Sequence, residues 1–490
     1  MKRVSNPLIM NDMKKLYIMM MLVLAGTMAM AQTSVWHGGR AVWTRGTGTE
    51  SDPFLLESAD NLAYLAYVVN KGYDTRDMYF RLTTDIDLNG SEDLQWTPIG
   101  CGTGGRWFNE DGCYRGNPSS YGIFYDGVIP SFHGHFDGGE HSISNIYIDN
   151  SEHMYDENIG LFGLAEGIKE GQEVYPAVIE NVFVTSGYLK GVYCGGIVGS
   201  GRNTTLVSRC WNGATIETVV GEDNMIQGCF GGIVGRDAYQ VKNCYNVGDV
   251  SGYYAGGIVG YGTAEIEECY NEGDINGTFA GGIYGFSRQY AVTINNCYNI
   301  GNIYAEGTPS IYPAGPAAGG IASFFFRGTS SITNCYNVGT VTSTKDVGCI
   351  LAYGPNVVLE NNYYINTCDV GGEGTPQTEE VMQSPAFVDL LNGQNEEHVW
   401  AMDVNHTNGG FPILTTIDLA VPEIIEASFN VYPNPAQGRF TVEGRGRMTV
   451  SNLLGQVVLV KEIDGQTTVA LPRGMYFVKL CNETRKIVVE

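Results

Sequence analysis

The 490-residue sequence is poor in charged side chains, and above all in basic ones. Charged residues make up 17% of the chain, against about 25% in ordinary soluble domains. Lys and Arg number 28 and Asp and Glu 53, which gives a net charge of −25. That charge repels nucleic acid and anionic lipid. Hydrophobic residues at 43% and aromatic residues at 11% exclude a disordered chain, which would lack the side chains for a core.

Several catalytic and metal-binding signatures are also missing. The sequence contains no HExxH, no GxSxG and no phosphate-binding loop. Its 12 cysteines include no close CxxC pair, which is the usual spacing of a zinc site. Beyond the first 31 residues, no stretch is apolar over the roughly 20 residues that a membrane helix needs.

Glycine, by contrast, is abundant. It accounts for 66 residues, close to twice the average share of about 7%. So many glycines argue against a mainly helical protein, because each costs about 1 kcal/mol in a helix. They lack the strict period of three that collagen requires.

The first 31 residues have the pattern of a secretory signal peptide. Lys14 and Lys15 precede an apolar run over residues 16–28. Ala29 and Ala31 then form a small-x-small cleavage site before Gln32. The alternative is a membrane anchor, but the apolar run is too short to cross a bilayer. We therefore expect cleavage before Gln32 and export.

The middle of the chain is a repeat with two signatures. The first is a Gly-Gly-Ile element that starts at Gly195, Gly231, Gly256, Gly281 and Gly319, and the first four copies close with Gly199, Gly235, Gly260 and Gly285. The second is Cys-Trp-Asn or Cys-Tyr-Asn, which starts at Cys210, Cys244, Cys269, Cys297 and Cys335. A period near 25 residues with insertions is typical of a solenoid.

Each repeat contains three short apolar segments bounded by Gly or Asn, which suit strands. We expect three strands per rung, with rungs stacked about 4.8 Å apart in a parallel β-helix. Glycine would supply positive φ angles at the corners. The asparagines of the second signature would stack and hydrogen-bond from rung to rung, namely Asn246, Asn271, Asn299 and Asn337.

The five repeated cysteines are expected to form a ladder of small buried side chains, mostly as free thiols. Disulfides between neighbouring rungs stay geometrically possible. Cys101 and Cys113, in a glycine-rich loop, are the best candidates for a disulfide.

The two ends of the solenoid need covers, since an open rung is an unpaired strand edge. The apolar periodicity predicts a helix over residues 58–70 and a first strand over residues 80–88. Ser384 and Pro385 predict the start of a second helix that ends at Gly393. We interpret both helices as caps.

Two acidic or histidine-rich segments are candidates for metal sites. Asp85, Asp87 and Asn89 match the opening of an EF-hand loop, but Trp96 stands where the bidentate Glu belongs. His133 and His135 lie two apart and share a face if they are on a strand. No partner ligand is evident from the sequence beyond the neighbouring Asp137, Glu140 and His141. We expect neither a metal nor another cofactor.

The Gly-Gly-Ile-Val-Gly elements resemble the GLUG repeat of bacterial surface proteins, which is common in secreted Bacteroidetes proteins. The resemblance covers roughly residues 40–415 and is clearest over residues 158–354. It implies a right-handed parallel β-helix that is exported and associated with the cell surface.

The last part of the chain resembles the type A C-terminal sorting domain of the type IX secretion system. Pro433 and Pro435 belong to its Tyr-Pro-Asn-Pro start, Gly474 to its Leu-Pro-x-Gly strand, and Lys486 is the basic residue near the end. The resemblance implies an immunoglobulin-like β-sandwich, recognition by the type IX machinery and removal by a sortase-like protease. The predicted organisation is a leader over residues 1–31, a capped β-helix over 32–414, a linker over 415–426 and the sorting domain over 427–490.

The sequence thus predicts an all-β, exported, adhesin-like protein that presents a β-helix face to glycans or proteins without enzymatic activity. The alternative is a carbohydrate-active β-helix enzyme, either a polysaccharide lyase or a glycosidase. Such an enzyme needs clustered carboxylates with Arg or Lys nearby, and basic residues are sparse in the repeats.

Overall fold

A computed structural model describes most of the chain. The described residues are 33–101, 130–151, 158–218, 228–307, 315–393, 398–415, 430–432, 436–452, 457–480 and 483–489, with two short strands at β5 (Phe108–Asn109) and β6 (Gly112–Cys113). They fall into two compact units, Met1–Ile417 and Asp418–Glu490. The expected cleavage site at Ala29, Ala31 and Gln32, most of the expected linker, and Pro433 and Pro435 lie outside the described residues.

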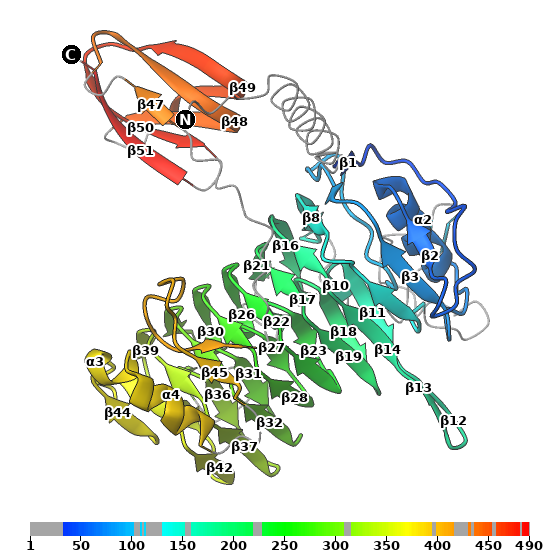
Figure 1. Ribbon diagram of the computed structural model, residues 1–490, viewed down its shortest axis with the longest axis vertical. Helices are drawn as coiled ribbons and strands as arrows, with labels where there is room; N and C mark the ends of the chain where they lie inside the picture. Colours follow the sequence, from blue (N-terminus) through cyan, green and yellow to red (C-terminus); the bar gives the residue numbers. More distant parts are fainter. Residues whose placement is uncertain are drawn as a thin grey trace, which may run out of the picture. The chain divides into compact units, whose positions relative to one another are not determined.

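The first unit is a parallel β-helix, as the repeat predicts (Figure 1). Its strands form four long parallel sheets, named here in the order in which one rung visits them. A rung runs through strands of sheets 1, 2, 3 and 4 and then returns to sheet 1, one step along the axis. The handedness of this winding stays a prediction.

Sheets 1 and 4 hold short strands. Sheet 1 consists of β1 (Ser34–Val35), β4 (Ile86–Asp87), β8 (Ser142–Ser144), β15 (Phe183–Val184), β20 (Trp211–Asn212), β25 (Tyr245–Asn246), β29 (Tyr270–Asn271), β33 (Tyr298–Asn299), β38 (Tyr336–Asn337), β43 (Tyr363–Ile365) and β44 (Thr375–Gln377). Sheet 4 consists of β2 (Phe54–Leu56), β3 (Tyr79–Leu82), β7 (His135–Asp137), β14 (Ala177–Glu180), β19 (Thr205–Ser208), β24 (Gln240–Lys242), β28 (Ala264–Glu267), β32 (Val292–Asn295), β37 (Ser330–Thr333) and β42 (Val357–Glu360).

Sheets 2 and 3 follow sheet 1 in each rung. Sheet 2 consists of β9 (Ile146–Asp149), β10 (Asn158–Ile159), β16 (Gly187–Gly191), β17 (Tyr193–Gly195), β21 (Thr215–Thr218), β22 (Cys229–Gly231), β26 (Val250–Gly256), β30 (Ile275–Gly281), β34 (Ile303–Ala305), β35 (Ala317–Gly319), β39 (Val341–Ser343) and β40 (Asp346–Gly348). Sheet 3 consists of β11 (Phe162–Glu166), β18 (Val198–Arg202), β23 (Val234–Arg236), β27 (Val259–Tyr261), β31 (Tyr284–Ser287), β36 (Ala322–Phe325) and β41 (Leu351–Tyr353).

The expectation of three strands per rung is wrong, because a full rung crosses four sheets. The Gly-Gly-Ile element is the elbow between a strand of sheet 2 and a strand of sheet 3, as between β26 and β27. The expected first strand over residues 80–88 is also two strands, β3 in sheet 4 and β4 in sheet 1, which are separated by a corner.

The glycines of the elbow are needed because other backbone atoms lie too close for a Cβ, and not because the backbone adopts a positive φ there. None of the signature glycines at 195, 231, 256 and 281 has a positive φ, which corrects the expectation for these corners. A Cβ on any of them would lie 2.0–2.1 Å from the carbonyl oxygen three residues on. The closing glycines 199, 235, 260 and 285 would meet the neighbouring rung's backbone at 2.4–2.6 Å.

Positive φ is found instead at the corner between sheets 4 and 1. The residue just before each repeated cysteine has a φ of 49–55°, and these residues are Arg209, Asn243, Glu268, Asn296 and Asn334. Asparagine is among the few residues that adopt this conformation readily, because its short polar side chain can hydrogen-bond locally. In three of these five rungs the corner therefore uses Asn where the sequence pattern suggested Gly.

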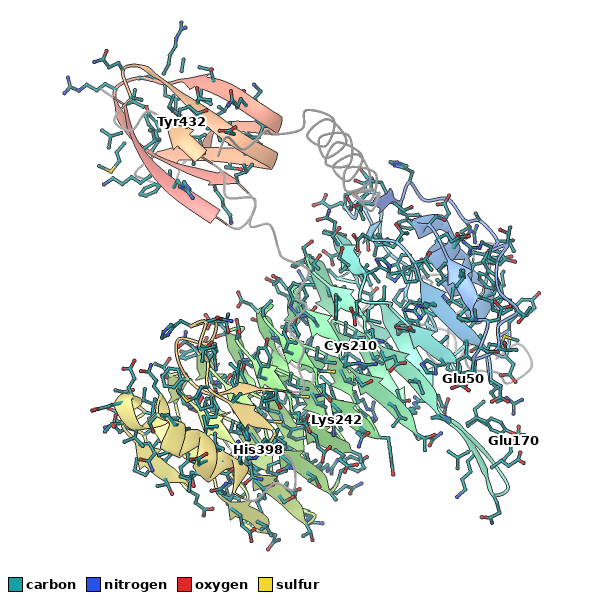
Figure 2. The ribbon with its side chains drawn as sticks, in the orientation of Figure 1. Glu50, Glu170, Cys210, Lys242, His398 and Tyr432 are labelled. Carbon is teal, nitrogen blue, oxygen red and sulfur yellow. A yellow bond between two sulfur atoms is a disulfide. The ribbon has the colours of Figure 1, made fainter. Side chains whose placement is uncertain are left out.

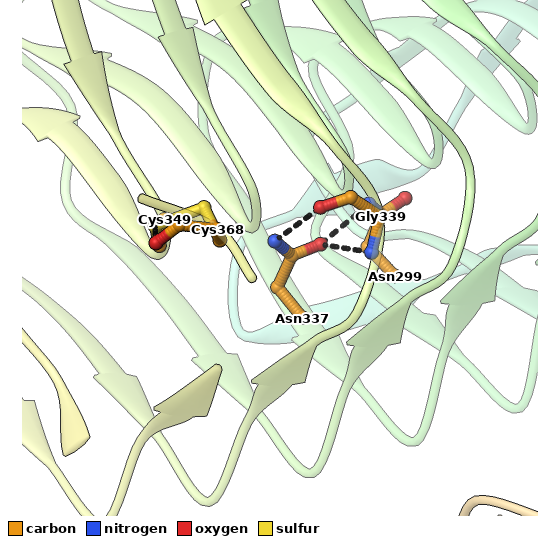
Figure 3. Close-up of a disulfide and its surroundings, with 5 residues drawn as sticks. All are labelled: Asn299, Asn337, Gly339, Cys349 and Cys368. Atoms are coloured by element: carbon orange, nitrogen blue, oxygen red, sulfur yellow. Dashed lines mark hydrogen bonds between the residues drawn. A yellow bond between two sulfur atoms is a disulfide. The ribbon is translucent and has the colours of Figure 1, made fainter. Parts of the chain in front are cut away.

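The repeated asparagines form a continuous buried ladder. The amide of Asn246 donates to Asn271 Oδ1 at 2.8 Å, and the same 2.8 Å bond links Asn271 to Asn299 and Asn299 to Asn337. Each amide also donates to a carbonyl two residues on in its own rung, as Asn337 does to Gly339 (Figure 3). The side chains are fully buried, so these bonds satisfy groups that would be costly to leave unpaired.

The five repeated cysteines lie beside this ladder, fully buried and not in disulfides. The backbone N–H of one cysteine donates to the Sγ of the next, at 3.4 Å, from Cys210 through Cys335. Burial raises the pKa of the Cys210, Cys244, Cys269 and Cys297 thiols well above the ordinary value. These side chains are therefore neutral packing groups; Cys210 is labelled in Figure 2.

Cys101 is in a disulfide, and the side chain of Cys113, its expected partner, lies outside the described residues. A second disulfide, Cys349–Cys368, was not expected (Figure 3). Cys349 occupies the position of the second elbow glycine. In earlier rungs a Cβ there would lie 2.2–2.5 Å from a ladder asparagine, but Tyr364 pairs with Asn337 where the next asparagine would be. The ladder ends there, so a side chain fits.

Replacing both Cys349 and Cys368 with Ala should destabilise the C-terminal end of the β-helix. The disulfide closes a loop with a sequence separation of 19, for which the chain-entropy model predicts a loss of about 3 kcal/mol. Thermal unfolding of the wild type and the double variant, with and without reductant, measures this. Under reductant the difference should disappear; equal midpoints without reductant would contradict the prediction.

Helices cover the described ends of the solenoid. Helix α2 (Ala59–Asn70) confirms the helix expected over residues 58–70, and it begins after Ser58, whose hydroxyl accepts from the Asn61 N–H. Helix α4 (Pro385–Asn392) begins after Ser384 in the same way and follows the short α3 (Glu379–Met382). The chain then forms the hairpin of β45 (Trp400–Ala401) and β46 (Ile413–Leu414), while a second hairpin, β12 (Ile168–Glu170) with β13 (Glu173–Tyr175), projects from the solenoid (Figure 1).

Trp400 places the C-terminal hairpin against a column of stacked rings on sheet 1. Trp211, Tyr245, Tyr270, Tyr298 and Tyr336 follow one another with centroids 4.7–5.5 Å apart and planes within 16°. The Trp400 ring lies 5.5 Å from Tyr336, and its Nε1 donates to Asn296 Oδ1 at 3.2 Å. Phe387 of α4 contacts Tyr336 at 6.2 Å, so the cap buries the end of this column.

The second unit is a small antiparallel β structure. It consists of β47 (Asn430–Tyr432), β48 (Arg439–Asn452), β49 (Val457–Ala470), β50 (Gly474–Leu480) and β51 (Glu483–Val489), hydrogen-bonded as one five-stranded sheet. Val442 and Met448, from the two halves of β48, lie in the same core as Val478 and Ile487. The strands thus enclose one core, although the hydrogen bonds do not divide them into the two separate sheets of the expected sandwich.

Candidate binding face

Aromatic side chains gather at the elbow between sheets 2 and 3. We call this set the elbow cluster, and it comprises Tyr193, Tyr254 and Phe279 of sheet 2 with Arg236, Tyr261, Phe286, Phe324 and Tyr353 of sheet 3. The sheet 3 members occupy consecutive rungs in register, from Arg236 to Tyr353. The cluster is separate from the column of stacked rings on sheet 1.

The rings of sheet 3 stack along the axis of the solenoid. Tyr261 and Phe286 have centroids 6.0 Å apart, Phe286 and Phe324 5.3 Å, and Phe324 and Tyr353 4.5 Å, with planes within 14°. Sheet 2 contributes contacts across the elbow. Tyr254 lies 4.5 Å from Phe286, and Phe279 lies 5.3 Å from Phe324. The two sheets therefore share one aromatic cluster.

The elbow cluster has a buried floor and an accessible edge. Phe279 and Phe286 are almost completely buried, whereas Tyr353 is 42% exposed. Tyr193, Tyr261 and Arg236 are half-buried. Because tyrosine offers an apolar ring and a polar hydroxyl, this edge can contact a partner through both.

A half-buried ion pair marks one end of the cluster. Arg236 Nε lies 3.1 Å from Asp237 Oδ2, and the guanidinium is 5.2 Å from the Tyr193 ring centroid. Burial raises the pKa of the Asp237 carboxyl, an effect that Arg236 partly opposes. Burial also raises the pKa of Tyr261 to about 12. The Tyr261 hydroxyl is therefore protonated at neutral pH and can donate a hydrogen bond.

The positions of this cluster follow a sequence pattern outside the two repeat signatures, so the signatures did not predict it. Counted from the first elbow glycine, the cluster uses the residue two before and the residue five after. In the rung that starts at Gly256 these are Tyr254 and Tyr261, and in the next rung Phe279 and Phe286. Both positions fall outside the Gly-Gly-Ile and Cys-Tyr-Asn signatures, so the sequence alone does not distinguish them from variable residues between the signatures.

The residues considered for metal binding have other partners. His135 Nε2 lies 2.7 Å from Glu180 Oε1, and His133 Nδ1 lies 2.7 Å from the Glu166 carbonyl oxygen. Asp85 accepts from the Ser142 N–H, and Asp87 accepts from the Asn89 N–H. Within the described residues, no group of three or more His, Cys, Asp or Glu side chains could hold a metal ion.

Some carboxylates lie beside basic groups on the solenoid surface. Glu180 contacts Arg209 at 3.3 Å as well as His135, and hydrogen bonding to His135 contributes to lowering the pKa of Glu180. Lys242 lies 3.2 Å from both Glu267 and Glu268; it is labelled in Figure 2. These pairs join neighbouring rungs, which suits a structural role along the stack.

Two families match parts of the chain. The secretion system C-terminal sorting domain matches residues 430–490, and the GLUG motif matches residues 251–276. The GLUG match begins within β26, contains β27, β28 and β29 and ends within β30, and the sorting-domain match spans β47 to β51. Comparison with curated proteins and with solved structures gives no match.

The chain therefore carries a type IX C-terminal sorting domain and a GLUG motif on a parallel β-helix. Of the expected sorting residues, Gly474 begins β50, and Lys486 in β51 pairs with Phe477. The sorting domain directs the protein through the type IX machinery to the outer cell surface or the medium. In the described part of the chain, no helix combines the length and the apolarity that crossing a bilayer would take.

Proposed function

We propose that this protein is a non-enzymatic, adhesin-like binding protein, which presents one face of its β-helix to glycans or proteins. The signal peptide that precedes Gln32 would bring it to the periplasm, and the sorting domain would take it across the outer membrane. Stacked-rung proteins commonly provide extended binding surfaces rather than deep catalytic sites.

The elbow cluster is the observation that carries this proposal. It places aromatic rings from consecutive rungs in one line, and its edge is accessible at Tyr193, Tyr261 and Tyr353. This arrangement suits an extended ligand such as a glycan chain or a peptide strand, because the accessible Tyr261 and Tyr353 lie three rungs apart along the solenoid. Tyrosine is enriched at binding surfaces because it gives a large contact area with few rotatable bonds.

Replacing Tyr353 or Tyr261 with Ala should weaken binding without unfolding the protein. Loss of one aromatic contact is expected to reduce affinity by about tenfold, which corresponds to about 1.4 kcal/mol. Wild type and variants would be compared on glycan and protein arrays, with the positive spots measured by titration.

The matched control is Tyr304→Ala, because Tyr304 is 38% exposed on sheet 2 and belongs to neither column of rings. It should bind like the wild type. If both elbow variants bind like the wild type while the array gives saturable ligands, the elbow cluster is not the binding face.

A further inference from the structure

A cavity of about 370 Å³ lies in the N-terminal cap. Its walls come from helix α2, from residues 36–40 of the segment after β1, and from residues 93–97 of the loop after β4. The volume is within the range of small-molecule sites, which starts at about 300 Å³. None of its residues belongs to the elbow cluster or to the repeat signatures.

The deep walls of the cavity are aromatic and fixed. Trp36 and Trp96 meet edge to face with centroids 5.5 Å apart, and both are buried. Their indole N–H groups are already used, since Trp36 donates to the Gly39 carbonyl at 2.9 Å and Trp96 to the Leu161 carbonyl at 3.1 Å. The two side chains therefore line the cavity with apolar surface, and their hydrogen bonds hold them in place.

The mouth of the cavity is polar. The Arg40 guanidinium lies 4.5 Å from the Tyr67 ring centroid, which holds it over helix α2. Asp93 is exposed on the opposite loop, and Gln95 is positioned because its Oε1 accepts from the Asp149 N–H at 3.0 Å. The charged lining thus consists of one cation and one anion.

We propose that this cavity binds a single neutral pyranose unit of a glycan. A pyranose has apolar C–H faces that pack on aromatic walls and hydroxyls that pair with carboxylate, amide and guanidinium groups. The lining supplies both kinds of group, because Trp36 and Trp96 are buried whereas Arg40 and Asp93 are exposed. A neutral sugar is favoured over an acidic one because Arg40 is balanced by Asp93 and the protein as a whole carries a charge of −25.

The site does not depend on the elbow cluster, since the two share no residue. It would give the protein recognition of one sugar unit, such as a chain end, beside the extended contact of the elbow. If the elbow cluster instead binds protein, the cavity would still bind its sugar.

The test is a titration of the full-length protein with methyl glycosides of neutral hexoses and N-acetylhexosamines, and with methyl glucuronide as the acidic comparison. Tryptophan fluorescence and calorimetry report binding, because Trp36 and Trp96 line the site. For a ligand of this size we expect a dissociation constant on the order of 1 mM for at least one neutral glycoside. Methyl glucuronide should bind more weakly than the neutral sugar.

Asp93→Ala and Arg40→Ala should each weaken that binding by about tenfold or more. Both side chains are exposed, so unchanged thermal unfolding is expected and separates a lost contact from a lost fold. Tyr304→Ala, in β34 and outside both the cavity and the elbow cluster, is the control and should bind the sugar normally. The proposal is overturned if no neutral glycoside binds saturably, if the glucuronide binds best, or if both cavity variants bind like the wild type.

Discussion

Deletion of residues 427–490 should leave the protein in the periplasm and abolish its delivery to the surface or the medium. The matched sorting domain begins at residue 430 and extends to the end of the chain. Its strands bury their own core, which includes Phe440, Val450 and Leu480, and the first unit is separately compact. The deletion should therefore remove the export signal while the β-helix still folds. Cell fractionation with immunoblotting measures the change, which should be close to complete.

The reciprocal fusion gives the control. Residues 415–490 joined to a periplasmic carrier protein should carry it out of the cell in a strain with a working type IX system. The same fusion should stay in the periplasm when that system is inactivated. Unchanged surface delivery of the deleted chain would contradict the assignment of the sorting domain.

Gly257→Ala should strongly destabilise the β-helix. A Cβ at this position would lie 2.0 Å from the carbonyl oxygen of Gly282 in the next rung and 2.5 Å from Cγ of Asn271 in the ladder. Neither neighbour can move without breaking hydrogen bonds of the stack, because Asn271 is bonded to Asn246 and Asn299. We expect a loss of about 3 kcal/mol or more in the free energy of unfolding.

Denaturant unfolding of the full chain measures this loss, with the transition of the β-helix fitted separately from that of the C-terminal unit. The matched control is Gly393→Ala at the end of α4, where φ is −61° and the nearest atom to an added Cβ is 3.4 Å away. That change should alter stability by less than about 1 kcal/mol. An equally mild effect at Gly257 would contradict the close-packed elbow.

The sequence allowed the architecture to be predicted because the rungs repeat chemically. Asn271 and Asn299 stand at equal positions of successive rungs, and stacking brings equal positions together. The number of strands could not be predicted, because strands such as β29 have two residues and show no alternation of apolar and polar side chains. The tight elbow after Gly256 likewise follows from contacts between rungs, which no local pattern reveals.

The Cys349–Cys368 disulfide is a different case, because the sequence contains a clue to it. Cys349 interrupts the Gly-Gly-Ile pattern one rung after Gly320, and Tyr364 interrupts the asparagine pattern in the same rung. Two exceptions at positions that touch each other indicate a local change in packing. Without the structure, however, nothing shows that the second elbow glycine and the asparagine are in contact.

Export and fold were therefore predictable from motifs, whereas the binding surfaces were not. The elbow cluster arises from spacer positions such as Tyr254 and Tyr261, which only the bend of the chain brings together. The cavity of the N-terminal cap depends on Trp36 and Trp96, which are far apart in sequence and in contact in the fold. Such surfaces depend on tertiary contacts that composition and period do not specify.

We expect the exported β-helix to bind its partner without cutting it. The most direct test is to incubate the purified protein with a panel of polysaccharides and to measure both retention and released products. At least one polysaccharide should be retained, no oligosaccharide or reducing end should be released, and Tyr353→Ala should lower the retention. Release of products from a bound polysaccharide would contradict this expectation and would favour the carbohydrate-active β-helix enzyme instead.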